Sequence, residues 1–168
     1  MTQALGAWGK DKYDFRMADL IGCLRKADPT DEAPYTLVRQ IAFNSCVGNH
    51  DAHAKNYSII IGPDKVGVSP LYDAISMAHW ARYRYDVLAI PVNDIYNPWE
   101  VTIDDWREEA RRCGLDPMRV EEIVVEVATA LTRVDYSSLP CGPRIGDEIR
   151  TLMGECTRDL MPSIGIRT

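Results

Sequence analysis

The nine residues GNHDAHAKN, from Gly48 to Asn56, concentrate side chains that could do chemistry. They include two of the three histidines of the chain, an aspartate, a lysine and two asparagines, directly before the apolar run YSIII. Side chains of these types can bind a metal ion, activate a nucleophile or position the groups of a phosphoryl transfer. Their spacing must decide among the three.

A metal centre is the first alternative, because His50, Asp51 and His53 are all metal-ligand types. The adjacent His50 and Asp51 are similar to the pair in HD-type phosphohydrolases, which also need a histidine well upstream. His50 is the first histidine of the chain, and His79 is the only one outside the motif. The sequence therefore argues against a metal centre of that type, and we interpret His50 as a solvated loop residue.

A nucleophile activated by a neighbouring base is the second alternative. Spacing alone identifies neither a serine in a sharp elbow nor a thiol paired with a histidine. Cys46, shortly before His50, is more simply interpreted as a buried helix residue.

Phosphoryl transfer is the third alternative, because Asp51 and Asn56 have the D-x-x-x-x-N spacing of a kinase catalytic loop. Such a loop can aim the carboxylate at an incoming hydroxyl while the amide oxygen coordinates magnesium on the nucleotide phosphates. A second carboxylate is then needed after the loop, and Asp73 in PLYD supplies it. The sequence favours this chemistry.

The full strings GNHDAHAKN and SPLYD resemble the HipA family of serine/threonine kinases. The C-terminal lobe of that family carries a G-N-x-D-x-H-x-K-N loop and a later P-x-Y-D element. The resemblance runs from the helix LVRQIAFN through the helical C-terminal region. It implies that Asp51 is the catalytic base and that Asn56 and Asp73 are magnesium ligands. The residues that it implies for cofactor binding are His53, Lys55, Asn56, Tyr72 and Asp73.

The same resemblance implies the reaction and its partners. ATP and Mg²⁺ would be the cofactors, and the γ-phosphate would go to a serine or threonine of a protein, one linked to translation. A DNA-binding antitoxin would be the partner, with no direct contact between this chain and nucleic acid. The chain is then a toxin kinase of a toxin-antitoxin system.

A complete kinase also needs a phosphate-covering loop, a strand lysine and an adenine-binding hinge. The sequence contains no G-x-G-x-x-G and no P-loop, and in the HipA family the ATP-covering part precedes the segment resembled here. We therefore expect a C-terminal lobe without its N-terminal lobe, active only when a partner completes it. The alternatives are a remnant of a truncated gene and a non-catalytic module that binds an antitoxin-like protein or itself.

The expected fold is mainly α with a small β-hairpin (α+β), a protein-kinase-like C-terminal lobe that is HipA-like. Apolar periodicity predicts helices, and β-branched residues around turn chemistry predict the hairpin. Residues 1–168 form one domain, with the catalytic loop at 48–56, the metal-binding Asp element at 69–73 and a helical part at 104–161. The predicted elements are helices 13–26, 37–48, 104–113, 117–131 and 145–160, a hairpin over 57–73 and an extended segment at 86–94.

Composition limits the function further. A formal charge of −6 and a pI near 5.0 argue against a surface built to neutralise phosphates. The five cysteines lack zinc-ligand spacing and are interpreted as reduced, mostly buried thiols. The absence of a leader pattern and of a long apolar run predicts no membrane segment and a cytoplasmic location. Three tryptophans are expected to pack in the core: Trp80, Trp99 and Trp106.

Overall fold

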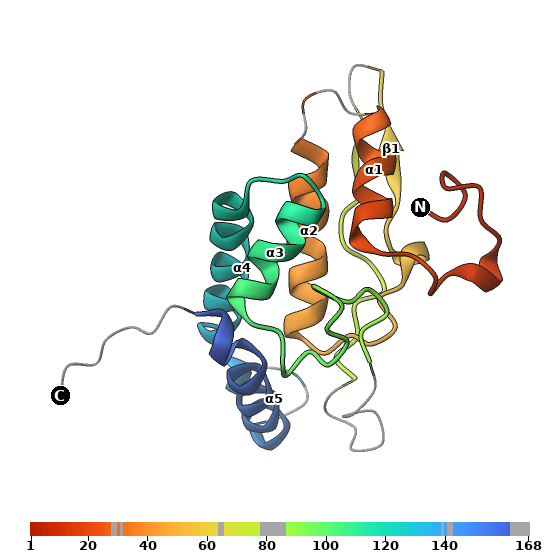
Figure 1. The fold of residues 1–168 in the computed structure, drawn as a ribbon. Helices are drawn as coiled ribbons and strands as arrows, with labels where there is room; N and C mark the ends of the chain where they lie inside the picture. The colour runs from red at the N-terminus through yellow and green to blue at the C-terminus, as the bar shows by residue number, and fades with distance from the viewer. Residues whose placement is uncertain are drawn as a thin grey trace.

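Helix α2 is the element around which the described part of the chain is organised. The computed structural model describes residues 1–27, 30, 32–63, 66–77, 87–138, 140 and 143–161. Within them, α2 packs against α1, α4, α5 and strand β2. Figure 1 shows α4 and α5 on one side of α2, and α1 with the hairpin on the other. The helices are α1 Met17–Ala27, α2 Glu32–Cys46, α3 Ile103–Arg112, α4 Pro117–Thr132 and α5 Pro143–Thr157, and the strands are β1 Ile59–Ile61 and β2 Val66–Val68.

The helix predictions are confirmed where the sequence carries explicit start and stop signals. The Asp116 side chain accepts a hydrogen bond from the Met118 amide (3.0 Å) at the start of α4, as an N-cap should. Gly114 has a φ of +66°, which ends α3. The Arg25 guanidinium of α1 donates to the carbonyls of Cys113 and Gly114, both at 2.7 Å. These bonds satisfy carbonyls that the end of α3 leaves open.

The first helix begins later than its periodicity predicts. It starts at Met17 rather than Tyr13, and residues before it form turns and the short 3-10 helix Gly9–Asp11. The apolar stripe itself is confirmed, because Met17, Leu20 and Leu24 are buried. The prediction failed because Tyr13 is turned toward another part of the chain, a contact that no local pattern encodes.

The hairpin is confirmed, but its second strand lies earlier than expected. Strands β1 and β2 are antiparallel, with Ile59 opposite Val68. Residues 69–73, expected to be extended as part of that strand, follow it as a loop. The expected strand within 86–94 is only an isolated bridge between Val92 and Ile95 in the described residues.

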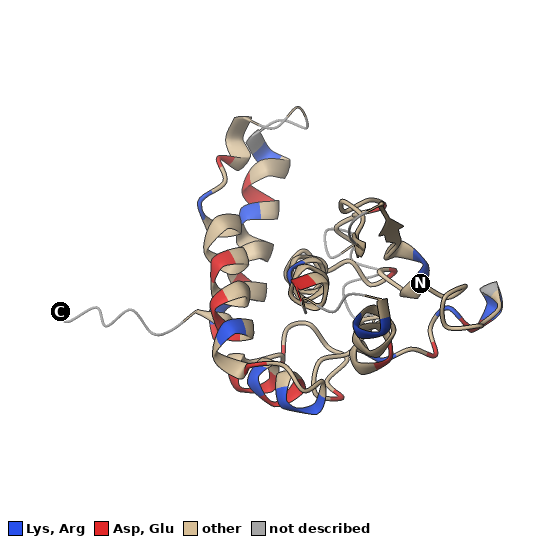
Figure 2. Ribbon diagram, turned by 90° about the horizontal axis from the view of Figure 1, so that it is seen from above, with Lys and Arg blue, Asp and Glu red and all other residues tan. Residues whose placement is uncertain are grey.

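The core lies between α2 and the helices packed on it. Trp106 is fully buried and Trp99 packs on a smaller cluster with Tyr136, which confirms these two as packing residues, whereas Trp80 and His79 lie outside the described residues. The four described cysteines form no disulfide with one another and are mostly buried, as expected, and Cys141 is not described. Among the described helices, none is long and apolar enough to cross a membrane. Figure 2 shows acidic and basic residues interspersed along the helices.

Two glycines of α5 give a matched stability test. A Cβ on Gly146 would lie 2.1 Å from the carbonyl oxygen of Tyr136, a backbone atom that cannot turn aside, whereas one on Gly154 would meet nothing within 4 Å. We expect Gly146→Ala to lower the free energy of unfolding by about 1–3 kcal/mol, through overpacking. Gly154→Ala should raise it by up to about 1 kcal/mol, because alanine favours the helix. Urea unfolding measures both, and equal effects of the two variants would contradict the packing of α5 described above.

Candidate active site

The loop predicted to carry chemistry begins where α2 ends. Gly48 has a φ of +63°, and the Asn49 amide donates to the Asn44 carbonyl at 2.9 Å, so the helix closes in a left-handed cap. Asn49 also donates through Nδ2 to Asn44 Oδ1 (2.9 Å) and to the backbone oxygen of Asp73 (3.3 Å). These bonds tie the loop to α2 and to the segment after the hairpin.

A buried tyrosine extends this network on the far side of the loop. Asn44 Nδ2 donates to the Tyr57 hydroxyl at 3.0 Å, and Tyr57 is fully buried. Burial raises the pKa of Tyr57, so its hydroxyl stays protonated. No role was predicted from the sequence for Asn44, Asn49 or Tyr57. Of the three, only Asn49 lies in the GNHDAHAKN motif, which could have indicated that it matters for the site.

Asn56 and Asp73 are brought together, as the kinase interpretation expects. Asn56 Nδ2 lies 2.6 Å from Asp73 Oδ2, although the hairpin separates them in the chain. Asn56 is buried, and its Oδ1 has no hydrogen-bond partner among the described residues. Asp73 is exposed and has a φ of +56°. An orphaned amide oxygen beside an exposed carboxylate is a donor set that suits Mg²⁺.

A rotation of the Asn56 amide would direct that oxygen at a cation. The oxygen and nitrogen of an asparagine amide are distinguished only by their hydrogen bonds. If the amide were turned over, Asn56 Oδ1 would take the place of Nδ2. Asn56 Oδ1 and Asp73 Oδ2 would then both face the space between them, where a cation could bind. The residues present therefore fit a magnesium ion. In contrast, the described residues contain no group of three or more His, Cys, Asp or Glu side chains that could hold a metal.

Asp51 lies at the exposed surface of the loop, with its side chain 53% exposed. The Tyr13 hydroxyl donates a hydrogen bond to its Oδ1. Lys12 Nζ lies 3.7 Å from the same oxygen, and His53 Nε2 lies 3.8 Å from it. A carboxylate with this exposure can be reached from solvent. The contacts from Tyr13 and Lys12 were not expected.

The histidines of the loop are less accessible than the sequence suggested. His50 and His53 are each only 6% exposed, so the interpretation of His50 as a solvated residue is wrong. The loop is enclosed by distant segments: the Ala54 amide donates to the Lys12 carbonyl (3.2 Å), and the Met77 amide donates to the Gly48 carbonyl (3.1 Å). A pattern of polar residues in a loop does not reveal such long-range contacts.

His53 provides a pH-dependent prediction. Burial, and then the charge of Lys12, lower its pKa below the ordinary value of 6.5, although Asp51 opposes the shift. The unfolded chain therefore takes up a proton near pH 6.5 that the folded chain refuses until lower pH, so stability is lost as pH falls through that window. We expect wild type to lose more stability between pH 7 and 5 than His53→Gln, in urea unfolding. A ¹³C-detected titration of His53 at or above pH 6.5 would contradict this prediction.

Lys55 and Tyr72 are also brought together, but on the outer side of the loop. The Tyr72 hydroxyl donates to the Lys55 carbonyl at 2.6 Å and lies 2.8 Å from Ser58 Oγ. Both side chains are exposed. Lys55 and Ser58 line a cavity of about 640 Å³ together with Trp8 and other N-terminal residues. This cavity borders the loop next to Asn56.

Cys46 is confirmed as a buried helix residue. It is 1% exposed, and burial raises the pKa of its thiol to about 12. The thiol therefore stays protonated and is a poor nucleophile.

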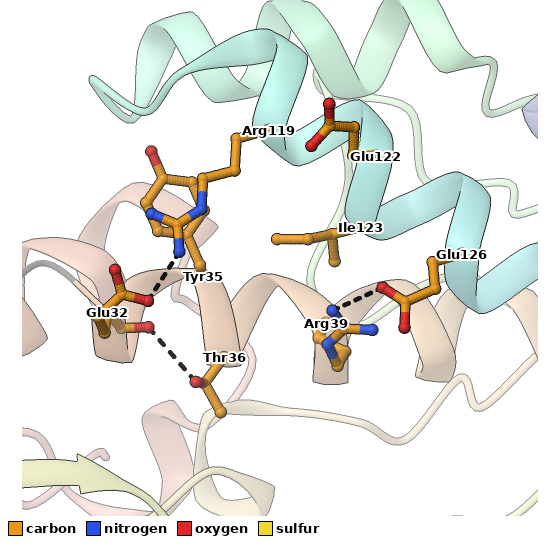
Figure 3. Close-up of a pocket in the computed structure, with 8 residues that line it drawn as sticks. All are labelled: Glu32, Tyr35, Thr36, Arg39, Arg119, Glu122, Ile123 and Glu126. Atoms are coloured by element: carbon orange, nitrogen blue, oxygen red, sulfur yellow. Dashed lines mark hydrogen bonds and ion pairs between the residues drawn. The ribbon is translucent and has the colours of Figure 1, made fainter.

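A second cavity, of about 300 Å³, lies between α2 and α4, with the lining residues drawn in Figure 3. Arg119 pairs with Glu32 (2.7 Å) and lies 3.8 Å from the centroid of the Tyr35 ring. Arg39 pairs with Glu126 (2.9 Å). Both guanidinium groups are paired with carboxylates, so among the described residues this groove joins the two helices through ion pairs.

The chain matches a known protein family. Residues 1–134 match the family model described as HipA-like C-terminal domain, and the chain therefore belongs to that family. This confirms the resemblance seen in GNHDAHAKN and SPLYD.

Individual relatives agree with this membership. The putative kinase Y4mE of Sinorhizobium fredii is 30% identical over 142 residues, which cover 79% of this chain and 33% of the relative. The serine/threonine-protein kinase toxin HipA of Shewanella oneidensis is 32% identical over 66 residues, 39% of this chain and 15% of the relative. The chain spans about a third of the length of Y4mE and of a second putative kinase, Y4dM, from the same organism.

A solved structure confirms the fold class. The complex of Shewanella oneidensis HipA and HipB with operator DNA matches with a TM-score of 0.71 and 20% sequence identity. The match covers 92% of this chain and 39% of the matched chain. The mainly helical lobe with a small antiparallel hairpin is therefore the HipA-like fold.

Proposed function

We propose that this chain is the catalytic lobe of a HipA-like protein kinase, transferring the γ-phosphate of ATP to a serine or threonine hydroxyl of a protein. The observation that carries the proposal is the Asn56–Asp73 pair, with an orphaned buried amide oxygen beside an exposed carboxylate. Asp51 stands in the same loop at kinase spacing and is open to solvent.

Each residue has a defined task in this proposal. Asn56 and Asp73 hold magnesium, which would neutralise charge on the nucleotide phosphates when bound. Asp51 accepts the proton of the attacking hydroxyl. His53 stays neutral at pH 7 because its pKa is lowered, and it can donate a hydrogen bond without competing for that proton. Lys55 and Tyr72 contact the nucleotide from the outer side of the loop.

The proposed enzyme needs a second lobe to cover the phosphates. The chain spans only about a third of its kinase-named relatives, and in this proposal the Asn56–Asp73 site would hold the nucleotide phosphates on one side. We propose that a phosphate-covering lobe completes the site and that an antitoxin-like protein is a partner, as HipB is for HipA in the matched complex. The substrate would be a protein linked to translation.

Calorimetric titration with ATP and Mg²⁺ tests the proposal. We expect weak binding to the chain alone, tighter binding once a phosphate-covering lobe is added, and no binding when EDTA removes the metal. A titration without heat in both the free and the completed state would overturn the proposal.

A non-catalytic interaction module is the second candidate, because apolar side chains are exposed on strand β1 and after the hairpin. Ile61 is 81% exposed on strand β1, and Ile60 and Ile75 are each about half exposed. Exposed apolar side chains that cluster in one region favour a protein interface. Self-association in analytical ultracentrifugation, combined with no binding of magnesium and ATP, would favour this module over the kinase lobe.

A further inference from the structure

We propose that Tyr13 occupies the position at which an acceptor hydroxyl meets Asp51, so that residues 9–16 act as an internal pseudosubstrate. A protein substrate would have to displace the Tyr13 side chain before its own hydroxyl could reach the base. The inference rests on the proposed function, because it takes Asp51 as the group that accepts the proton.

The geometry reproduces the contact that phosphoryl transfer requires. A general base must accept a hydrogen bond from the hydroxyl whose proton it removes. The Tyr13 hydroxyl already donates such a bond to Asp51 Oδ1. Among the described residues, the Lys12 ammonium and the His53 ring also approach Asp51 at this same oxygen. The acceptor position on Oδ1 is therefore filled from within the chain.

A tyrosine can block this position because its hydroxyl is a hydrogen-bond donor. Here that phenolic hydroxyl donates to the Asp51 carboxylate. The Tyr13 ring lies edge-on to His53, with ring centroids 5.2 Å apart, and Lys12 Nζ lies 4.6 Å from the Tyr13 ring. The ring therefore packs against the loop at His53.

The Tyr13 side chain is exposed enough to be released from Asp51. Tyr13 is 51% exposed, and Lys12 and Asp51 are also open to solvent. The segment contains only one short 3-10 helix, and α1 begins directly after it with the buried Met17. The Lys12 carbonyl stays bonded to the buried Ala54 amide (3.2 Å), so the exposed Tyr13 side chain is the part of the segment that can leave the loop. Release of this side chain would remove the Tyr13 donor from Asp51.

The competing explanation is that Tyr13 positions Asp51 for catalysis. In that case, loss of the hydroxyl should slow every transfer that uses Asp51. If Tyr13 is a pseudosubstrate, loss of the hydroxyl should accelerate transfer, since water or another hydroxyl can take its place. Hydrolysis of ATP, in which water is the acceptor, separates the two explanations without any knowledge of the protein substrate.

The test compares Tyr13→Phe with Tyr96→Phe in the full chain. Tyr96 is a matched control, because it is also an exposed tyrosine near a basic side chain: its ring lies 5.1 Å from the Arg16 guanidinium. Three quantities are measured: the affinity for ATP with Mg²⁺, the rate of ATP hydrolysis at saturating nucleotide, and the labelling of Asp51 by carbodiimide and glycine ethyl ester, read by mass spectrometry.

We expect Tyr13→Phe to leave the nucleotide affinity unchanged while hydrolysis and Asp51 labelling rise by about tenfold, the worth of one hydrogen bond to a charged group. Tyr96→Phe should change none of the three. A slower or unchanged hydrolysis rate at intact affinity would overturn the pseudosubstrate and leave the kinase proposal standing. If hydrolysis is below detection in both variants, equal Asp51 labelling overturns it. Absence of nucleotide binding overturns the kinase proposal, and this inference with it.

Discussion

Replacing Asp51 by asparagine is expected to slow phosphoryl transfer in the completed enzyme by about 10²–10⁴-fold, the usual contribution of a general base. An asparagine has nearly the same shape, and its amide oxygen can still accept the Tyr13 hydroxyl, so the loop should keep its geometry. Only the ability to take up a proton is lost. The measurement is the transfer rate at saturating ATP and protein substrate.

Asp147→Asn is the matched control for this variant. Asp147 is an exposed aspartate on α5 that pairs with one basic side chain, Arg150, at 3.1 Å. It lies in the helical part, outside the loop and the Asp73 element. Its substitution should leave the transfer rate unchanged, and both variants should unfold at the same urea concentration as wild type. A fully active Asp51→Asn enzyme would remove Asp51 from the mechanism.

Substitutions in the Asn56–Asp73 pair should have the second largest effect, and it should fall on nucleotide binding. Asn56→Ala removes the amide oxygen, and Asp73→Asn removes the carboxylate charge, that would face the proposed cation. We expect each to weaken magnesium-dependent ATP binding by about tenfold or more, as the loss of a contact to a charged group does. The Mg²⁺ concentration needed for half-maximal binding should rise in both. Calorimetry at several Mg²⁺ concentrations measures these changes.

The chain offers a control with the same pair of groups elsewhere. Asn93 Nδ2 donates to Asp105 Oδ1 at 2.9 Å, and Asn93 Oδ1 is also buried without a partner among the described residues. Asn93→Ala therefore removes an equivalent amide-to-carboxylate bond next to α3. Its nucleotide binding should match wild type. Equal losses in Asn93→Ala and Asn56→Ala would mean that the effect is structural.

The sequence was sufficient for those parts of the fold that local signals determine. Asp116 and Gly114 mark the boundaries of α4 and α3 because capping and left-handed backbone are properties of single residues. The apolar stripes of α1 and α2 were correct for the same reason, since a helix repeats every 3.6 residues. The approach of Asn56 to Asp73 followed from motif order, once the hairpin between them was recognised.

Other features depended on contacts between distant segments and left no local pattern. The burial of His50, the Tyr13 hydroxyl on Asp51 and the Asn44–Tyr57 bond are of this kind. The same limit explains the late start of α1. A tyrosine three or four residues before a helical stripe fits the period by chance, and only the folded chain shows that it turns away.

The backbone of Asp73 has a consequence for anyone who wishes to engineer this lobe. Its φ of +56° is a conformation that glycine adopts freely and that other residues adopt at a cost of about 1 kcal/mol. A screen for thermostable variants without an activity assay would therefore tend to select Asp73→Gly. Such a screen would remove a proposed magnesium ligand while the measured thermostability increased. Stability alone is a misleading objective at this position, and a library should keep residue 73 fixed.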